Sequence, residues 1–485
     1  MIQPSTEHYD VVVVGSGPSG QKAAIQAVKL GKKVLVVERD LKVGGSCVHR
    51  GTIPSKTLRE TAISLTNFEK RSAGVFELKA TQDLQVASLM KRLDQVVEGH
   101  VHYMGQQLGR EGVEICHGRA SFVNEHEFEI IRVDRTRFRV KGDVIVIAVG
   151  SRPRDPNNMT VDHHHIVDSD SLLSMLYLPQ SLLVLGAGVI ACEYATVFAS
   201  LGVKVTIVDK GERPLAFLDK EVTDRFVKSF EEKGGVYLPG RNVETAKWDG
   251  LSTVTVRMED GEEVSAEKCL FALGRVARLE GLKIEKAGLG TTSRGVIPVN
   301  ENCQTKVKHI YAVGDVIGPP SLASAAMEQG RQAICHAFDI ESSAENYYLP
   351  SGIYAIPEIS CVGMNQTQVR EKFGKAIVGR ARFEEVARGQ IAGIEDGFLE
   401  LITGPDGKRL LGAQILGEGA SDLIHVAQMA MVADMPIDGF IDNIFNFPTL
   451  TEAYRLAAFD IMVQRGDMDQ VARRNRGGES VSTRK

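Results

Sequence analysis

Cysteine is scarce in this chain, and its pattern excludes two common kinds of protein. The seven cysteines stand at positions 47, 116, 192, 269, 303, 335 and 361 of the 485 residues. No two of them have the close spacing of a metal site, and an odd number does not suit a disulfide-held scaffold. We therefore expect no metal centre, and we expect every cysteine except Cys47 to be an ordinary thiol of a reducing compartment.

Long apolar runs and a strong net charge are also absent. No apolar stretch reaches the length of about 18 residues that a membrane-spanning helix needs. Residues 1–10 lack the basic and apolar segments of a signal peptide. The formal net charge of -5 does not favour nucleic-acid binding. These absences predict a cytoplasmic enzyme with neither a membrane nor a nucleic acid as partner.

The first positive signal is a nucleotide-binding pattern near the N-terminus. Residues 9–14 (YDVVVV) form a continuously apolar, β-branched run that predicts a buried parallel strand. A GxGxxG sequence at 15–20, a helical stretch at 21–30 and a second strand at 33–37 follow, and this second strand leads into Glu38. This order of elements predicts a Rossmann-type dinucleotide site.

Each key position of such a motif has its own physical task. This chain has a glycine or an acidic residue wherever the task requires one. Gly15 permits the tight turn, Gly17 lets the backbone approach a pyrophosphate, and Gly20 lets the helix pack on the strand. The helix N-terminus favours the phosphate charge. Glu38 can accept hydrogen bonds from ribose hydroxyls.

The same pattern returns in the middle of the chain. A strand at 181–185 leads into GAGVIA at 186–191, a helix at about 192–201 and a strand at 204–208 that ends at Asp209. A single glycine motif is weak evidence, but two complete units predict two dinucleotides.

The acid of the second unit bears on the choice of nucleotide. Asp209 favours an unphosphorylated ribose, hence NAD(H), because a 2′-phosphate beside it would be repelled. Lys210 and Arg213 follow closely and could offset that repulsion. The residues therefore favour NAD(H) and leave NADP(H) open.

At this point the chain resembles the flavoprotein disulfide reductases over about residues 9–463. Three more motifs of that family stand in the right order: VIAVGSRP at 146–153, FALGR at 271–275 and IYAVGD at 310–315. The resemblance implies FAD in the first fold, NAD(P)H in the second, and two crossovers between them. It also implies that Asp315 contacts the ribityl chain of FAD.

Two departures from the family pattern concern the redox chemistry. The redox loop, residues 43–56 (VGGSCVHRGTIPSK), holds Cys47 but has Thr52 where the family has a second cysteine. Near the C-terminus, Phe447 stands where the family has a histidine that acts as acid and base for the thiol substrate. One sulfur cannot form a disulfide within the loop, so the disulfide half of the reaction is not expected.

This combination is similar to the soluble pyridine nucleotide transhydrogenases within that family. The similarity implies hydride transfer between NADPH and NAD+ through one FAD, in a ping-pong order. An NAD(P)H oxidase or diaphorase that reduces oxygen or quinones fits the same departures, and a flavin-bearing redox sensor without turnover is a further alternative. A disulfide reductase fits least well.

The resemblance also assigns site residues. Lys56 is expected near the reactive nitrogen of the flavin, paired with Glu193, while Cys47 is expected as an inert thiol and Thr52 as a neighbour of the flavin ring. The cofactor-binding positions that it implies are Gly15, Gly17, Gly20, Glu38, Arg39, Gly44, Gly45, Ser46, Cys47, Lys56, Ala120, Gly150, Ser151, Gly186, Gly188, Glu193, Asp209, Gly274, Arg275, Gly314, Asp315 and Ala323.

The expected fold class is α/β, with two Rossmann-like domains and a C-terminal α/β interface domain through which family members form homodimers. The alternation of short β-branched strands with helix-length segments supports the layers. The expected boundaries are 1–153 and 283–350 for the FAD domain, 154–282 for the NAD(P) domain, 351–465 for the interface domain and 466–485 for a disordered tail.

Overall fold

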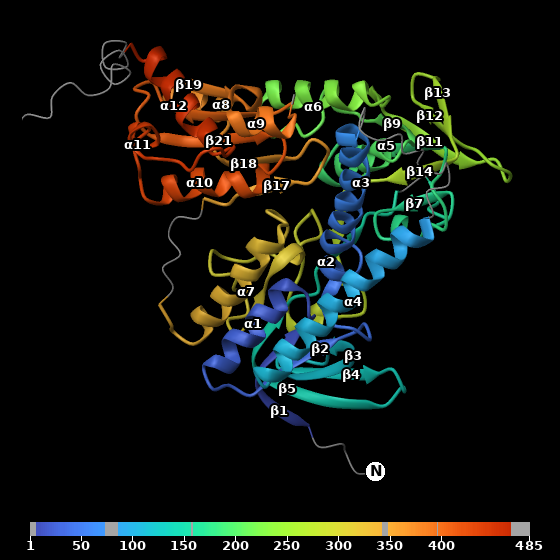
Figure 1. The fold of residues 1–485 in the computed structure, drawn as a ribbon. Helices are drawn as coiled ribbons and strands as arrows, with labels where there is room; N and C mark the ends of the chain where they lie inside the picture. Colours follow the sequence, from blue (N-terminus) through green and yellow to red (C-terminus); the bar gives the residue numbers. More distant parts are fainter. Residues whose placement is uncertain (1–5, 73–85, 157–158, 342–347, 395, 467–485) are drawn as a thin grey trace, which may run out of the picture. The chain divides into compact units, whose positions relative to one another are not determined.

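The computed structural model describes residues 6–72, 86–156, 159–341, 348–394 and 396–466. The fold is α/β, as predicted (Figure 1). Contacts divide the chain into two compact units: Met1–Leu185 with Glu244–Ala344, and Gly186–Val243 with Glu345–Lys485. The first is called unit 1 and the second unit 2. The predicted tail lies, from residue 467 on, outside the described residues.

Unit 1 is built on a six-stranded sheet. Its strands are β1 (Glu7–Val14), β2 (Val34–Glu38), β3 (Glu114–Phe122), β4 (Glu127–Arg132), β5 (Arg137–Ile147) and β16 (Ile310–Ala312). β1 lies between β2 and β5 and runs parallel to both, β3 is parallel to β2, and β16 is parallel to β5. β4 pairs antiparallel with β3 and β5. The continuously apolar strand at the centre is buried on both faces, as expected for a parallel sheet.

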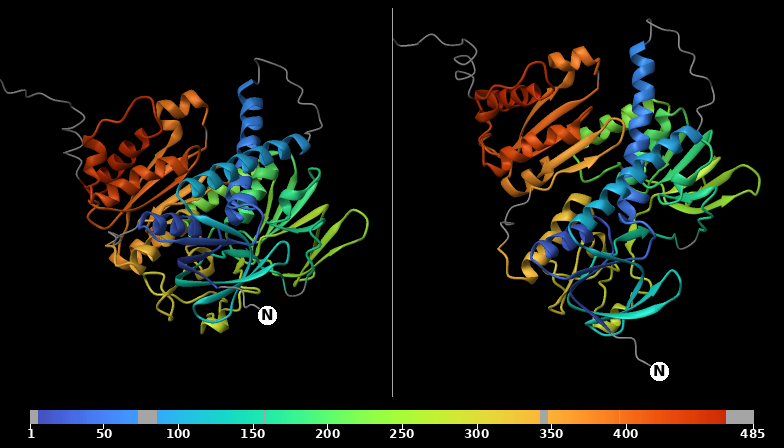
Figure 2. Two further views of the ribbon diagram at one scale, coloured as in Figure 1. Left: turned by 90° about the horizontal axis from the view of Figure 1, so that it is seen from below. Right: turned by 60° about the horizontal axis from the view of Figure 1, so that its bottom comes forward.

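Unit 1 also contains helices, some of which cover this sheet. They are α1 (Pro18–Lys29), α2 (Gly45–His49), α3 (Thr52–Ser72), α4 (Val86–Arg110) and α7 (Ala323–Ala337), together with the short 3₁₀ turn η3 (Gly314–Ile317). α1 and α7 lie side by side, blue and gold in Figures 1 and 2. Their backbones approach closely because Gly330 carries no side chain, and a Cβ there would lie 2.1 Å from the Ser19 carbonyl oxygen.

The first predicted helix begins earlier than the sequence pattern indicates. The sequence pattern predicts a helix over 21–30, whereas α1 starts at Pro18. Proline suits the first turn of a helix, where its missing N–H has no intrahelical partner and its φ is already helical. The glycine motif therefore leads directly into the helix.

Unit 1 also holds smaller strands. β6 (Ser151–Pro153) pairs with β15 (Arg275–Ala277), so the two predicted crossovers lie together as one antiparallel ribbon. The remaining strands are β7 (Ile166–Asp168), β8 (Ser181–Leu185) and β14 (Lys268–Phe271), and the meander β11 (Val243–Trp248), β12 (Val254–Met258) and β13 (Glu263–Ala266), with the turns η1 (Leu172–Ser174) and η2 (Ile284–Ala287). β14 runs parallel to both β7 and β8.

Unit 2 begins with the second nucleotide motif. Its elements are α5 (Val189–Ser200), β9 (Lys204–Val208), α6 (Lys220–Glu232) and β10 (Val236–Leu238), with β10 parallel to β9. The predicted strand at 204–208 is confirmed, and the predicted helix at 192–201 starts three residues earlier, directly after Gly188.

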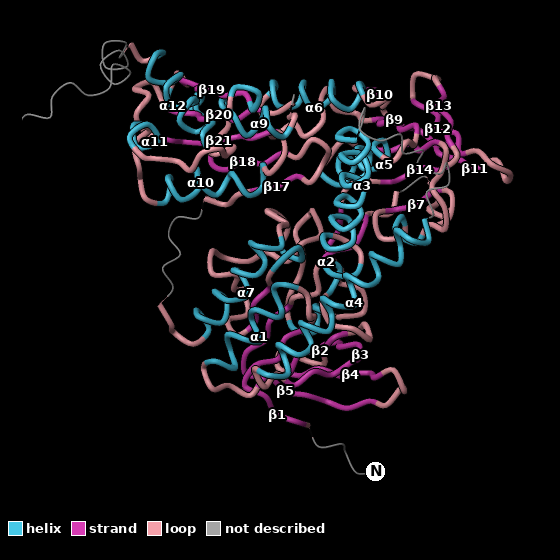
Figure 3. Tube along the Cα trace, viewed as in Figure 1, coloured by secondary structure: helices cyan, strands magenta, loops and turns pink. Residues whose placement is uncertain are grey.

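The rest of unit 2 is an antiparallel five-stranded sheet with helices (Figure 3). Its strands, in spatial order, are β17 (Ser351–Ile353), β18 (Ile359–Gly363), β21 (Leu410–Leu416), β20 (Phe398–Thr403) and β19 (Ile377–Arg382). The helices are α8 (Gln366–Phe373), α9 (Ala387–Ala392), α10 (Ala420–Val432), α11 (Asp438–Asp442) and α12 (Glu452–Gln464), with the turn η4 (Phe383–Glu385).

Side chains alternate along β20 between two faces of this sheet. Leu399 and Leu401 join the apolar core that α10 and α12 cover, while Ile402 packs with Val369 of α8 on the other face. Glu400 lies on that second face and is completely buried. The sheet therefore carries one charged group into its interior.

Candidate functional site

The first glycine motif and the start of the redox loop form one continuous cradle in unit 1. Gly15 has a φ of 106°, and the Gly15 N–H donates to Val37 O at the end of β2. A Cβ on Gly20 would lie 2.0 Å from the Gly15 carbonyl oxygen, and one on Gly45 would lie 2.9 Å from the Gly17 Cα. By contrast, a Cβ on Gly17 would meet nothing within 4 Å. Open space above Gly17 is what a bound pyrophosphate requires.

Glu38 lies at the edge of this cradle and is held by its neighbours. Oε2 of Glu38 accepts hydrogen bonds from the backbone N–H (2.9 Å) and the hydroxyl (2.5 Å) of Ser16, and Oε1 accepts from the Asp40 N–H. The Ser16 hydroxyl also accepts from the Gly44 N–H at 3.1 Å. The acid therefore ties the glycine turn to the redox loop, and its lone pairs leave capacity for ribose hydroxyls. The sequence reasoning did not single out Ser16, although its place inside the motif was the available signal.

The two crossovers and the second FAD motif meet at Ser151. The Ser151 hydroxyl donates to Oδ2 of Asp315 at 2.6 Å and accepts from Nε of Arg275 at 2.8 Å. Glycines at 150, 274 and 314 turn the chain around this cluster, all with positive φ. The Gly314 N–H donates to Oε1 of Gln329 on α7, a partner that the sequence reasoning missed.

The remaining predicted FAD residues of unit 1 are placed more simply. Ser46 lies in the first turn of α2, Ala120 lies on β3 opposite Ile130, and Ala323 is the first residue of α7. Arg39 follows Glu38 and forms a 3.8 Å ion pair with Asp40.

Cys47, Thr52 and Lys56 lie together because α2 and α3 are joined by a single short turn. Burial raises the pKa of the Cys47 thiol above its ordinary value; the Thr52 hydrogen bond and the positive charge of Lys56 lower it without cancelling that effect, and Asp315 raises it further. A raised pKa keeps the thiol protonated near neutral pH, and a protonated thiol is a poor nucleophile. This supports the expectation that Cys47 is inert, and the effect of Asp315 shows that the second FAD motif lies close to the redox loop.

Unit 1 also holds a polar cavity of about 530 Å³ that the sequence did not indicate. Its lining includes Arg50, Arg152 and Arg278. Burial lowers the pKa of Arg278, and the charges of Arg39 and Arg50 lower it further.

The histidines at 163–165, of which His163 lines this cavity, lie in a turn that Asp162 holds by accepting backbone hydrogen bonds. Within the described ranges, no three His, Cys, Asp or Glu residues are grouped as a metal site would require.

In unit 2 the second glycine motif repeats the geometry of the first. Gly186 has a φ of 101°, and its N–H donates to Val208 O at the end of β9. A Cβ on Gly188, just before α5, would meet nothing within 4 Å. Asp209 follows β9 directly, and its Oδ2 accepts the Gly211 N–H at 2.9 Å.

Glu193 lies on α5 and is buried. Its Oε1 accepts the backbone N–H of Tyr354 at 2.9 Å, and one turn further on the Thr196 hydroxyl accepts the N–H of Ile356 at 3.0 Å. These contacts attach the motif helix to the segment between β17 and β18. Sequence reasoning could not find these partners, which lie about 160 positions away.

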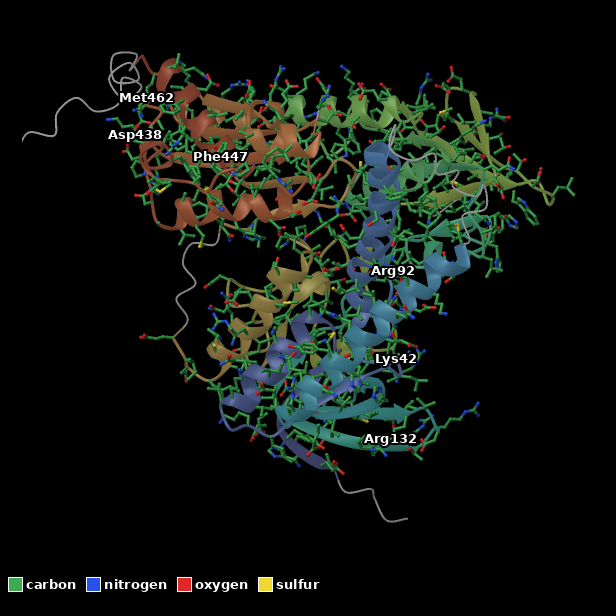
Figure 4. The ribbon with its side chains drawn as sticks, viewed as in Figure 1. Lys42, Arg92, Arg132, Asp438, Phe447 and Met462 are labelled. Carbon is green, nitrogen blue, oxygen red and sulfur yellow. The ribbon has the colours of Figure 1, made fainter. Side chains whose placement is uncertain are left out.

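Phe447 lies in the C-terminal part of unit 2 (Figure 4). Its side chain is 69% exposed in the single chain. An aromatic ring has no titratable proton, so this position cannot serve as an acid or base.

These sites define a protein with two dinucleotide-binding motifs and no disulfide in its redox loop. The sequence matches the family of pyridine nucleotide-disulphide oxidoreductases over residues 9–330, and the dimerisation domain of the same family over residues 349–458. The chain belongs to this family, as predicted.

Individual relatives show which members of the family this chain is similar to. The soluble pyridine nucleotide transhydrogenase of Mycobacterium bovis (strain BCG / Pasteur 1173P2) is 40% identical over 466 residues, covering 96% of this chain and 99% of the relative. The protein of that name from Sodalis glossinidius is also 40% identical, covering 95% and 99%.

Two solved structures are similar in fold. The HOCl-induced flavoprotein disulfide reductase RclA from Escherichia coli, in its Cu(II) complex, has a TM-score of 0.85 at 25% identity, covering 94% of this chain and 99% of that chain. LpdA from Mycobacterium tuberculosis has a TM-score of 0.86 at 24% identity, covering 94% and 100%. No helix of the described residues is both long and apolar enough to cross a membrane.

Proposed function

We propose that this chain is an FAD-dependent enzyme that transfers hydride between NADPH and NAD+. The observation that carries the proposal is the similarity, at 40% identity over nearly the full length, to proteins named soluble pyridine nucleotide transhydrogenase. The departures at Thr52 and Phe447 support it, because they remove the sulfur and the acid-base group that a disulfide substrate needs. Bound FAD supplies the hydride chemistry, and the protein supplies position and electrostatics.

The residues of unit 1 hold the cofactor. The cradle of Gly15, Gly17 and Gly45 fits the pyrophosphate, and Glu38 fits the adenosine ribose. Asp315, whose carboxylate accepts a hydrogen bond from Ser151, would accept another from the ribityl chain.

Lys56 and Glu193 are proposed to act as a charge pair at the flavin, on the basis of the family resemblance. A fixed cation near the reactive nitrogen stabilises the negative charge that reduction brings, and a carboxylate keeps that cation in place. The backbone N–H of Tyr354 donates to Oε1 of Glu193 and so helps to fix the orientation of this carboxylate. Cys47 is proposed to act as a neutral packing group near Lys56.

The proposal extends to assembly and location. The match to a dimerisation domain over residues 349–458 supports a homodimer formed through the antiparallel sheet region of unit 2. A cytoplasmic location is proposed from the composition. The domain boundaries 1–153, 154–282, 283–350 and 351–465 remain predictions.

Anaerobic transfer from NADPH to thio-NAD+ tests the proposal, because reduced thio-NAD+ is spectrally distinct from NADPH. Formation of thio-NADH by the purified, FAD-loaded protein is the expected result. If NADH bleaches the flavin quickly but no thio-NADH forms from either donor, the enzyme is an oxidase or diaphorase instead. Full flavin content without reduction by either nucleotide would indicate a redox sensor.

A further inference from the structure

The loop that follows β9 carries the charges nearest the ribose end of the second nucleotide motif. Asp209 is half-buried, and its carboxylate is fixed by the Gly211 N–H at 2.9 Å. The Asp209 backbone N–H donates to Leu238 O, and the Asp209 carbonyl accepts from the Arg241 N–H at 2.8 Å. The negative charge is therefore held in one place at the carboxyl end of the strand, where a ribose would lie.

Arg213 makes its side-chain hydrogen bonds with groups other than Asp209. Nη1 of Arg213 donates to Leu218 O at 2.9 Å and to the Thr223 hydroxyl at 3.3 Å, and Nη2 donates to Ala216 O at 2.8 Å. The guanidinium is thus turned toward the segment that enters α6, which it clamps. The sequence left Arg213 open as a partner for a 2′-phosphate, and the structure uses three of its five N–H donors elsewhere.

Gly211, two residues after Asp209, has no side chain that could donate a hydrogen bond to a 2′-phosphate. Gly211 has a backbone conformation open to any residue, so glycine is not required there by φ. A Cβ at this position would lie 2.8 Å from Oδ2 of Asp209. A side chain reaching this spot would meet the acid directly, and none is present.

A second acid lies on the same loop. Glu212 is exposed, and its Oε1 would lie 3.3 Å from a Cβ on Gly240, whose N–H donates to Gly211 O. Burial raises the pKa of Tyr237 on β10, and the negative charges of Asp209 and Glu212 both add to that effect. Both carboxylates therefore make the region around Tyr237 more negative. Lys210, the basic residue next to Asp209, is exposed to solvent.

We propose that this edge of the second nucleotide site is built for a ribose 2′-hydroxyl. NAD(H) therefore binds well, whereas NADP(H) binds more weakly because Asp209 and Glu212 repel its 2′-phosphate. Arg213 is a structural clamp and not a reader of the 2′-phosphate. The inference deepens the proposed function and rests on it for one consequence. If the chain is a transhydrogenase, this edge gives it a high KM for NADPH. Two like charges close together repel each other strongly where water is partly excluded.

Two probes that differ only in the 2′-phosphate test this directly. Adenosine 5′-monophosphate and adenosine 2′,5′-bisphosphate are titrated calorimetrically into the FAD-loaded dimer. The wild type is expected to bind the monophosphate at least tenfold more tightly. Asp209→Asn and Glu212→Gln should each narrow this ratio several-fold, and the double change Asp209→Ser with Gly211→Arg should invert it. Asp224→Asn is the matched control, because it removes one acid from α6, where Asp224 pairs with Lys220.

Three results would overturn the proposal. The first is wild-type binding of the bisphosphate as tight as that of the monophosphate. The second is a selective loss of bisphosphate binding in Arg213→Lys, which keeps the charge but cannot keep all three contacts. The third is the same selective loss in Arg241→Ala, the other arginine near Asp209. Thermal melting confirms that each variant is folded.

Kinetics separate this inference from the proposed function. A KM for NADPH at least tenfold above that for NADH, with thio-NADH formed from both donors, supports both. If thio-NADH forms only from NADH while the calorimetric ratio holds, the specificity inference stands and NADPH-linked transhydrogenation fails.

Discussion

The hydroxyl of Ser151 donates a 2.6 Å hydrogen bond to Oδ2 of Asp315, although 164 positions separate the two residues. Arg275, from the other crossover, donates to the same hydroxyl at 2.8 Å. The chain thus returns twice to one point of unit 1, and the carboxylate proposed to hold the flavin is oriented by residues from both crossovers.

Replacing Ser151 by alanine should weaken FAD binding. The change leaves Asp315 and Arg275 without their shared partner, and an unsatisfied buried polar group costs about 1–3 kcal/mol. We expect FAD to dissociate about tenfold more readily, since a factor of ten corresponds to about 1.4 kcal/mol. The measurement is flavin fluorescence released on dilution. Ser265→Ala, which removes an exposed hydroxyl paired with Thr255, is the control and should change nothing.

Cys47 should be dispensable for hydride transfer. Because burial raises its pKa, the thiol stays protonated as pH rises through neutrality and forms a thiolate only at higher pH than a free cysteine. We expect Cys47→Ser to keep the rate of flavin reduction by NADH within about threefold of wild type, because the effect of losing one packing contact is small. Stopped-flow absorbance measures this rate. A loss of a hundredfold or more, with full flavin content, would show that the sulfur takes part in the reaction.

Unlike Cys47, Lys56 should affect the rate of flavin reduction. If its charge stabilises reduced flavin, Lys56→Met should slow flavin reduction by about 100-fold, the lower end of the range for a lost electrostatic contact. Lys56→Arg should recover part of the rate. Lys42→Met removes an exposed lysine that forms a 3.8 Å pair with Glu98 and is labelled in Figure 4, so it serves as the control. Equal rates in all three variants would remove Lys56 from the mechanism.

Much of the fold could be read from the sequence, because its signals are local. The apolar β-branched runs before Gly15 and Gly186 predict the central strands, and the glycines predict turns that the structure shows with positive φ. The order of the family motifs predicts the family, which the relatives confirm.

The contacts that tune the site could not be read in this way. The hydrogen bonds of Arg213 to the turn before α6, and of Glu193 to Tyr354, depend on where distant backbone lies in space. Glu400 shows the same limit: in an alternating strand a lone acid predicts a solvent-facing position, yet it is fully buried. Its burial depends on Arg380, which lies directly opposite on β19.

This buried pair yields the last prediction. Nε of Arg380 donates to Oε1 of Glu400 at 2.6 Å, and Nη2 of Arg380 pairs with Glu221 of α6 at 2.7 Å. Removing one partner of a buried pair leaves an uncompensated charge, which costs about 3–5 kcal/mol. Since Arg380 is 39% exposed, we expect Arg380→Met to lower the free energy of unfolding by about 3 kcal/mol, at the lower end of that range. Arg382→Met, an exposed neighbour paired with Glu384, should cost less than about 1 kcal/mol.

The pH dependence distinguishes this lost charge pairing from simple loss of packing. Burial raises the pKa of Glu400 above its ordinary 4.5, and Arg380 only partly reverses this. A raised carboxyl pKa means that the folded state binds the proton more readily than the unfolded state, so this group favours folding at low pH and less so as pH rises. Without Arg380 the pKa should rise further. The destabilisation by Arg380→Met should therefore be larger at about pH 7.5 than at about pH 5.5 in parallel urea titrations. A loss that is the same at both pH values would mean that the destabilisation does not arise from the unpaired charge of Glu400.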